Sequence, residues 1–580
     1  MLPAKLTTTL AAIITLVAIL LTAGGCRPRE TSDRLNAPAA PARAPWFEDI
    51  TGRSRIHFFH EATTSGHHLF HESMGSGAAV LDFDNDGRLD VYLIHNVERG
   101  TAATNRLFHQ QADGAFKDIS AGSGLDVTGL GNGLAVGDIN NDGFPEVLIT
   151  EYDGVRLFLN HGGRRFTDIT ATAGITNRHW SVPAAFVDYD RDGWLDLVIG
   201  NYLDYDRSQK CPDARGRPDF CGPHGFHSTI TRLHRNLGVT AGTPKFADVS
   251  VASGIARAPG KAMQIVCADF DGDRWPDIFI TDDGLPNRLF MNQRNGRFVE
   301  EAVVRGVAYT GMGAAAANMG IAIGDTDADG RFDLFVPHLA EESHTLWRQT
   351  TGGVFHDATA TAGLHGQSWH GTGFGAVLAD FDADGALDLA IANGAIRRRT
   401  GPPRGSLANG IAPFWADYAE PAQLFANDGR GRFTEISRAN PALCGEALVG
   451  RGLACGDLDN DGALDLILIG ISGPVRVLRN IAAPRAHWLG LRAIDPTLGG
   501  RDAYGAEIVV EAGTNRWWRL IQPAHSYASS NDPRVQVGLG NHANVDAIRV
   551  RWPDGSDERF SGGPANQYLT LRRGAGTAVK

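Results

Sequence analysis

The chain has 580 residues, of which 43% are hydrophobic and 71 are glycines, enough for a large folded core with many turns. Its formal net charge is −12, and its longest basic run is Arg397–Arg399. This charge balance argues against nucleic acid as a partner.

Residues 1–25 are predicted to be a signal segment. Lys5 precedes the apolar run LTTTLAAIITLVAILLTA (6–23), and two glycines precede Cys26. This order resembles a bacterial lipoprotein signal, with cleavage before Cys26 and a lipid on its thiol. The alternative is an uncleaved signal anchor, since about 20 apolar residues can span a bilayer. Under both interpretations the chain is exported. We expect a lipid anchor at the outer membrane or cell surface. Residues 26–45 are expected to be a disordered Pro/Ala-rich tether.

An acidic nonapeptide recurs seven times in the next part of the chain. The first copy is DFDNDGRLD (82–90), and the others begin at residues 138, 188, 269, 325, 380 and 457. The copies begin 50 to 56 residues apart, except after the third and sixth, where the spacing is 81 and 77 residues. The pattern indicates a structural repeat of about 55 residues with two insertions. The insertions, 201–232 and 391–423, are expected to project from one face and to carry much of the contact with a partner.

Each repeat predicts four short antiparallel strands. A small-residue apolar run precedes the acidic loop, a β-type run such as VYLI follows it, and a pair such as RLFHQQADGAFKDIS comes next. The last repeat lacks its final strand, whereas an orphan strand, WFEDIT, stands at 46–51. The sequence therefore predicts a seven-bladed all-β propeller over residues 46–481, closed by its N-terminal strand.

The acidic loops predict structural calcium sites. Side-chain oxygens at positions 1, 3, 5 and 9, with glycine at position 6 for a sharp turn, can converge on one hard cation. An EF-hand is not expected, because position 12 is an apolar residue in every copy. We expect several Ca²⁺ ions, up to seven, and we expect the C-terminal residues to be nearly indifferent to their removal. The predicted ligands are Asp82, Asp84, Asp86 and Asp90; Asp138, Asn140, Asp142 and Glu146; Asp188, Asp190, Asp192 and Asp196; Asp269, Asp271, Asp273 and Asp277; Asp325, Asp327, Asp329 and Asp333; Asp380, Asp382, Asp384 and Asp388; and Asp457, Asp459, Asp461 and Asp465.

Residues 482–580 are predicted to form a second all-β module, either a short sandwich or a barrel. Alternating runs such as AEIVVEA and RVQVGLG are separated by glycine, proline and asparagine. Trp517 and Trp518 are either a ligand platform or, more commonly for such a pair, packing residues.

These motifs carry a resemblance to a known family. The DxDxDGxxD loops resemble the FG-GAP/VCBS repeats of integrin-alpha-type propellers. The segments HWLGL (487–491), GRDAYGAEIVV (500–510), SYASSNDPRVQVGLG (526–540) and VDAIRVRWPDG (545–555) resemble the ASPIC/UnbV domain. The combination is similar to bacterial members of the cartilage acidic protein family. The resemblance implies an integrin-alpha-like propeller with a calcium role and names no activity.

The cysteines separate by position. Cys211 and Cys221 bracket PDARGRPDF within the first insertion and are favoured as a disulfide. Cys444 and Cys455 form either a second bridge or two thiols, and Cys267 is expected in the core.

The channel mouth of the propeller is the candidate ligand site. Its predicted rim consists of Trp180, Lys261, Asn318, Trp369, His370 and Arg451, which stand before the acidic loops. The favoured function is a surface binding or adhesion module for a protein or glycan. The alternative is an extracytoplasmic carbohydrate-active enzyme of the lyase or dehydratase type, for which only Lys261, His370 and Arg451 offer acid or base groups. No familiar catalytic motif occurs in a convincing setting.

Overall fold

The computed structural model describes residues 44–63, 65–213, 215–367, 369–399, 404–482 and 486–579. The predicted signal segment, Cys26 and nearly all of the predicted tether lie outside the described residues. Among the residues described, no helix is both long enough and apolar enough to cross a membrane.

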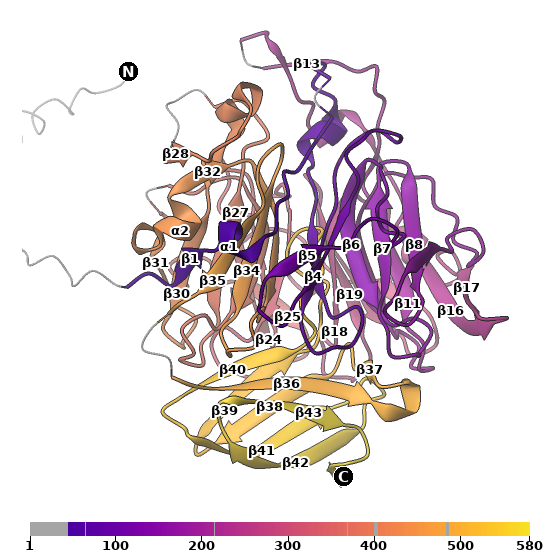
Figure 1. Ribbon diagram of the computed structural model, residues 1–580, viewed down its shortest axis with the longest axis vertical. Helices are drawn as coiled ribbons and strands as arrows, with labels where there is room; N and C mark the ends of the chain where they lie inside the picture. The colour runs from indigo at the N-terminus through magenta and orange to yellow at the C-terminus, as the bar shows by residue number, and fades with distance from the viewer. Residues whose placement is uncertain are drawn as a thin grey trace, which may run out of the picture. The chain divides into compact units, whose positions relative to one another are not determined.

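The predicted all-β propeller fold is confirmed (Figure 1). Seven four-stranded antiparallel sheets share one strand order and are called propeller sheets one to seven here. Sheets one to three consist of β2 (Ala78–Leu81), β3 (Asp90–Leu93), β4 (Arg106–Gln110) and β5 (Phe116–Asp118); β6 (Gly131–Gly137), β7 (Glu146–Glu151), β8 (Gly154–Asn160) and β9 (Phe166–Asp168); and β10 (Ser181–Val187), β11 (Asp196–Asn201), β16 (Arg232–Thr240) and β17 (Thr243–Asp248). Sheets four and five consist of β18 (Ala262–Ala268), β19 (Asp277–Asp282), β20 (Arg288–Asn292) and β21 (Phe298–Glu300); and β22 (Ala322–Gly324), β23 (Asp333–Val336), β24 (Thr345–Thr350) and β25 (Val354–Asp357). Sheets six and seven consist of β26 (Gly373–Ala379), β27 (Asp388–Asn393), β30 (Gln423–Asn427) and β31 (Phe433–Glu435); and β33 (Gly450–Gly456), β34 (Asp465–Gly470), β35 (Arg476–Asn480) and β1 (Phe47–Asp49).

The N-terminal strand completes the last propeller sheet, as predicted. β1 runs antiparallel to β35, with Phe47 opposite Asn480 and Asp49 opposite Leu478. Asp49 also accepts a hydrogen bond from Arg476 at 3.0 Å. The closure therefore leaves β35 with no unpaired edge.

The first strand of each propeller sheet is rich in small residues because the centre of the propeller is crowded. A Cβ on Gly77 would lie 1.8 Å from the carbonyl oxygen of Ala528, and one on Gly133 would lie 2.4 Å from that of Val182. No side chain fits at these two positions. The small residues thus mark close backbone approach as well as strand character.

The two predicted insertions emerge at the edge opposite the acidic loops, because they join second to third strands. The first contains β12 (Leu203–Asp204), β13 (Cys211–Pro212), β14 (Pro218–Asp219) and β15 (His227–Ser228); the second contains β28 (Ser406–Leu407), a 3₁₀ helix (Pro413–Tyr418) and β29 (Glu420–Pro421), which pairs with β32 (Glu446–Leu448). Figure 1 shows β13 and β28 at the end of the propeller away from the C-terminal strands.

These insertions form one structure with the chain before β2. We call the described residues of 57–75, 203–228 and 395–419 the cap. Phe220 stacks on Trp415 with ring centroids 5.5 Å apart, and Tyr418 donates a hydrogen bond to Asp219 at 2.6 Å. His68 lies 5.2 Å from the Phe220 ring. The two insertions are therefore packed against each other.

The C-terminal module consists of two sheets. In one sheet, β36 (His487–Asp495) pairs with β37 (Arg501–Asp502), β40 (Val535–Gly540) and β43 (Gln567–Arg572). The other contains β39 (Asn515–Leu520), β38 (Glu507–Ala512), β41 (Asn544–Arg551), β42 (Asp557–Pro564) and β44 (Thr577–Val579). Leu491, Val510 and Ile548 are buried among its core residues.

Candidate calcium centre

The seven acidic loops lie at one edge of the propeller sheets, since each joins the first strand of a sheet to the second. The loop at 82–90, for example, joins β2 to β3. This edge meets the C-terminal module through hydrogen bonds to Asp380 and Asp457. The repeat in the sequence thus becomes a ring of similar loops on one face.

Each loop is shaped around the carboxylate at its first position. Asp82 accepts the backbone N–H of Asp86 through Oδ1 and that of Gly87 through Oδ2, both at 3.0 Å. Asp138, Asp325 and Asp457 make the same pair of bonds. The fourth residue, such as Asn85 with φ 58°, and the sixth, such as Gly87 with φ 83°, have left-handed backbones. The glycine at position 6 is therefore explained by the turn.

Loop four departs from the repeated sequence pattern but keeps left-handed backbone conformations at positions 4 and 6. Gly272 stands at position 4 with φ 80°, and Arg274 takes position 6 with φ 75°. The Arg274 guanidinium donates to the carbonyl oxygen of Gly555 at 2.6 Å and pairs with Asp557 at 2.9 Å. The arginine thus holds the C-terminal module.

The acidic residue at position 9 ties the loop to the third strand. Asp90 accepts the N–H of Gln110 at 2.8 Å through Oδ1 and that of Phe83 at 3.4 Å through Oδ2. Glu146 does the same with Asn160 at 3.2 Å and Ile139 at 2.9 Å. The same two contacts recur at Asp196, Asp277, Asp333, Asp388 and Asp465. Prediction of these residues as calcium ligands missed this second role.

Carboxylates converge in the loops as a divalent cation requires. Atoms of Asp82, Asp84 and Asp90 lie within 4.8 Å of one another, and the same holds for positions 1, 3 and 5 of loops three, four and five. Several buried oxygens in this set have no hydrogen-bond partner: Oδ1 of Asp84, Asp188, Asp190, Asp327 and Asp380. Unpartnered buried oxygen atoms beside other carboxylates fit a calcium ion, which binds only hard oxygen ligands.

The electrostatics of the loops point the same way. Burial, aided by neighbouring carboxylates, raises the pKa of Asp82 and Asp138 to about 6 and that of Asp380 to about 7. Arginines neutralise part of this charge: Arg235 lies 2.7 Å from Asp190 and 2.9 Å from Asp192. Such partly exposed pairs contribute little stability, so a cation within the loop would be the stronger neutralising group.

The predicted ligand rim is wrong for four of its six members. Trp180, Lys261, Asn318 and Arg451 are at most 5% exposed. Trp369 and His370 are half-buried. The propeller therefore presents no open ring of these side chains to a ligand.

Backbone carbonyl oxygens accept hydrogen bonds from Lys261 and Arg451, two charged residues of the predicted rim. Lys261 Nζ donates to Pro223 at 2.7 Å, and Arg451 donates to Ser73 at 3.0 Å and to Gly394 at 2.8 Å. These contacts leave Lys261 and Arg451 without the freedom that acid or base catalysis needs. The enzyme alternative gains no support from them.

The C-terminal module fills the centre of the propeller. Carbonyl oxygens of Ser526, Ala528 and Ser530 accept backbone N–H groups of Ile321, Leu134 and Val80 at 2.9, 3.0 and 2.9 Å, in or beside three first strands. The Tyr527 side chain is fully buried and donates to the carbonyl oxygen of Met74 at 3.2 Å. Sequence reasoning missed this plug, although the small residues of SYASSN suit such a site.

The module also binds the acidic loops themselves. Tyr568 donates to Asp457 at 2.6 Å, and the Gly538 N–H donates to Asp380 at 2.8 Å. A Cβ on Gly385 would lie 2.3 Å from the indole of Trp517, and a Cβ on Gly330 would lie 3.3 Å from the indole of Trp518. The tryptophans are packing residues. Because first-position carboxylates hold the module, we now expect it to respond to calcium removal rather than to be nearly indifferent.

The cysteine pairing is settled for the described residues. Cys211 and Cys221 form a disulfide, the pairing favoured from the sequence, with their Cα atoms 5.1 Å apart. Cys444, Cys455 and Cys267 are free thiols, and burial raises the pKa of all three. The disulfide closes a loop of the cap.

Comparisons with known proteins agree with this architecture. The FG-GAP-like repeat model matches residues 82–149, 138–199 and 231–336, and the ASPIC and UnbV model matches residues 497–578. Cartilage acidic protein 1 of Xenopus tropicalis is 27% identical over 513 residues, covering 83% of this chain and 70% of that protein. The protein of the same name from Homo sapiens is 25% identical over 500 residues, covering 77% and 72%.

Two solved structures match this chain at low similarity. One, of an Agrocybe aegerita lectin described as recognising non-reducing terminal N-acetylglucosamine, has a TM-score of 0.35 and 14% identity and covers 69% of this chain and 94% of its own. The other, BBS1N in complex with ARL6DN, has a TM-score of 0.39 and 9% identity and covers 76% and 99%. The FG-GAP-like repeats, the ASPIC and UnbV domain and the homology to cartilage acidic protein 1 match the cartilage acidic protein family suspected from the sequence.

Proposed function

We propose that the protein is an exported, calcium-binding propeller that acts at the cell envelope as a binding or adhesion module for a protein or glycan. The FG-GAP propeller with its ASPIC/UnbV domain suggests a ligand-binding module. The observation that carries the calcium part is the set of buried, unpartnered carboxylate oxygens in the loops, such as Asp84 Oδ1 and Asp327 Oδ1. Calcium is proposed as a structural ion.

Counting bound calcium tests this part directly. Dialysis of the full chain against millimolar calcium, followed by elemental analysis, should recover several ions, up to seven per chain. Asp327→Asn should remove one of them, because it deletes a charge from loop five without touching the backbone bonds of Asp325. Asn140→Asp is the matched control, since it adds a carboxylate at the same position of loop two and should lose none. Recovery of less than one ion from the wild type contradicts the proposal.

The cap is the proposed contact surface for the partner. The channel is filled and the opposite edge is covered by the C-terminal module, whereas the cap combines insertions from two sheets. Phe59 is 42% exposed and Leu407 is 40% exposed, and both belong to cap segments. Exposed apolar side chains on inserted loops are typical of contact surfaces.

The cap assignment can be tested on a glycan array and by cross-linking to intact cells. Phe59→Ser and Leu407→Ser should each weaken binding of whatever ligand the wild type captures. Met312→Ser is the control, because Met312 is 93% exposed and lies outside the cap. If the control weakens binding as much as the cap variants do, the contact surface lies elsewhere.

The lipid anchor is proposed from the sequence around Cys26, which lies outside the described residues. Cys26→Ser should leave the chain unprocessed or release it into the soluble fraction. Unchanged membrane association with an intact N-terminus would instead support the uncleaved signal anchor.

A further inference from the structure

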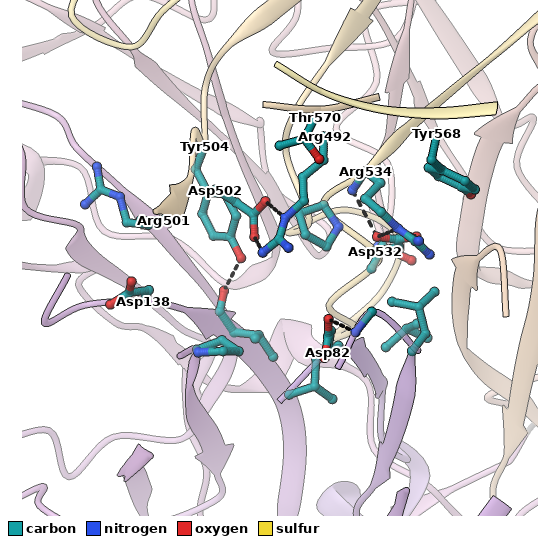
Figure 2. Close-up of a pocket in the computed structure, with 18 of the residues that line it drawn as sticks. Asp82, Asp138, Arg492, Arg501, Asp502, Tyr504, Asp532, Arg534, Tyr568 and Thr570 are labelled. Carbon is teal, nitrogen blue, oxygen red and sulfur yellow. Dashed lines mark hydrogen bonds and ion pairs between the residues drawn. The ribbon is translucent and has the colours of Figure 1, made fainter. Parts of the chain in front are cut away.

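A cavity of about 380 Å³ lies between the propeller and the C-terminal module (Figure 2). The propeller contributes Val80 and Leu81 of β2 and Val136 of β6 to its wall, and the module contributes Arg492 and Tyr504. Thr570, on β43, also lines the cavity and is exposed, so it marks the opening. The cavity falls within the size range of sites for small organic ligands.

The propeller side of this cavity combines an apolar wall with two loop carboxylates, Asp82 and Asp138. Val80, Leu81 and Val136 are at most 5% exposed and belong to the packed cores of their sheets. Tyr504 fixes its ring at the cavity by donating its hydroxyl to the carbonyl oxygen of Val136 at 3.2 Å. These groups offer a dry surface to the apolar body of a ligand.

Arg492 supplies an open cationic edge. Its Nε donates to Asp502 Oδ1 at 2.7 Å and its Nη2 donates to Asp502 Oδ2 at 3.1 Å. No hydrogen bond joins the remaining nitrogen, Nη1, to any residue that the structure describes, and 30% of the side chain is exposed. Figure 2 shows the pair between Tyr504 and Arg534. Asp502 holds the guanidinium in place and leaves donors for an anion.

The surrounding contacts show that the cavity is not a loosely packed interface. Arg534 makes two bonds with Asp532, at 3.0 and 2.9 Å, and reaches Asn460 at 2.6 Å. Protein interiors tolerate few voids larger than a water molecule. This well-bonded interface encloses a space that is apolar on one wall and charged elsewhere, with one open guanidinium edge, and such a space suits an amphipathic occupant.

We propose that the cavity binds a small amphipathic organic anion, with its apolar body against Val80, Leu81 and Val136 and its acidic group on the open edge of Arg492. This site is separate from the cap and borders the acidic loops, because Asp82, Asp138 and Asn460 also line the cavity. It places a small-molecule site at the junction of the two domains.

Two dyes that differ by one charged group test the proposal. The probes are 8-anilino-1-naphthalenesulfonate and N-phenyl-1-naphthylamine, which share an aromatic frame, while only the first carries a sulfonate. Fluorescence titration of the full chain in calcium should show one saturable site that binds the sulfonate about tenfold or more tightly than the neutral dye. The double variant Arg492→Gln, Asp502→Asn keeps a hydrogen-bonded pair without charge and should abolish this preference.

Filling the cavity should remove both dyes. Val136→Trp occupies the apolar wall, and Thr570→Trp narrows the opening if the first variant does not fold. Met312→Gln, at an exposed apolar site, is the control for surface adsorption and should bind as the wild type does. The proposal is overturned by equal wild-type affinity for the two dyes, by sulfonate binding that survives both tryptophan variants, or by binding lost in the Met312 control.

Discussion

Asp327→Asn provides the sharpest test of structural calcium, because its effect on stability should change with the metal. Asp327 lies at position 3 of loop five beside Asp325 and Asp329, and its Oδ1 is buried without a partner. With the affinity of extracellular calcium modules, about 10⁻⁴ to 10⁻³ M, calcium at about 1 mM stabilises one loop by about 0.4–1.4 kcal/mol. Loss of one loop should lower the free energy of unfolding in calcium by that amount.

In chelator the same substitution should not destabilise the protein. Without the ion, Asp327 repels Asp325 and Asp329, and its contact with Arg348 at 3.4 Å is half-exposed and weak. The free energy of unfolding should therefore stay level or rise in Asp327→Asn. Denaturant titrations in calcium and in chelator measure both values, and Asn140→Asp should show the opposite pattern. Equal losses under the two conditions would refute the role of Asp327 as a calcium ligand.

Two further predictions concern pH and domain contact. In chelator, the free energy of unfolding should fall as pH rises from about 5 to about 8. In the folded state the pKa is about 6 for Asp82 and about 8 for Asp90, both above the ordinary 3.8. The folded protein therefore binds protons that the unfolded chain does not, and it loses their stabilising effect across this range. In calcium, stability should instead rise with pH. Melting temperatures that rise with pH both in chelator and in calcium would contradict this prediction. Chelation should also speed hydrogen exchange at residues 522–540, because Asp380 and Asp457 hold the module, and Tyr568→Phe should speed it even in calcium. If neither chelation nor Tyr568→Phe alters hydrogen exchange at residues 522–540, the loops and the module are uncoupled.

The propeller was predictable because its signals are local and repeated. Each acidic loop needs only its own nine residues to form its turn, and the flanking β-type runs follow at fixed distances. Even ring closure, a contact between Phe47 and Asn480, was readable, because one repeat lacked a strand that an orphan segment supplied. One acidic loop alone predicts little, but seven copies at similar spacing predict a repeat fold.

The centre of the propeller was not predictable from the same signals. Lys261 and Arg451 precede acidic loops, where an open propeller would expose them, but the structure buries them beneath the cap and around the plug. That outcome depends on Ser526–Ser530, which contact first strands hundreds of residues away. No local pattern encodes which distant segment fills a channel. The role of Arg274, which stands in the glycine position of loop four, is non-local in the same way: it contacts Asp557 of the C-terminal module.

The acidic loops differ in how many carboxylate oxygens remain for an ion, and this difference follows from the module. Asp457 Oδ2 already accepts hydrogen bonds from Tyr568 at 2.6 Å, Gln536 at 3.2 Å and the Gly462 N–H at 2.7 Å. In loop three, by contrast, Oδ1 of Asp188 and of Asp190 is buried and free of such bonds. An ion in loop seven must share its first ligand with the domain interface, whereas an ion in loop three does not. Similar sequence motifs thus acquire different chemistry from their neighbours: we expect loop three to be the better calcium site, and loop seven to be the one in which calcium binding and domain docking use the same atom.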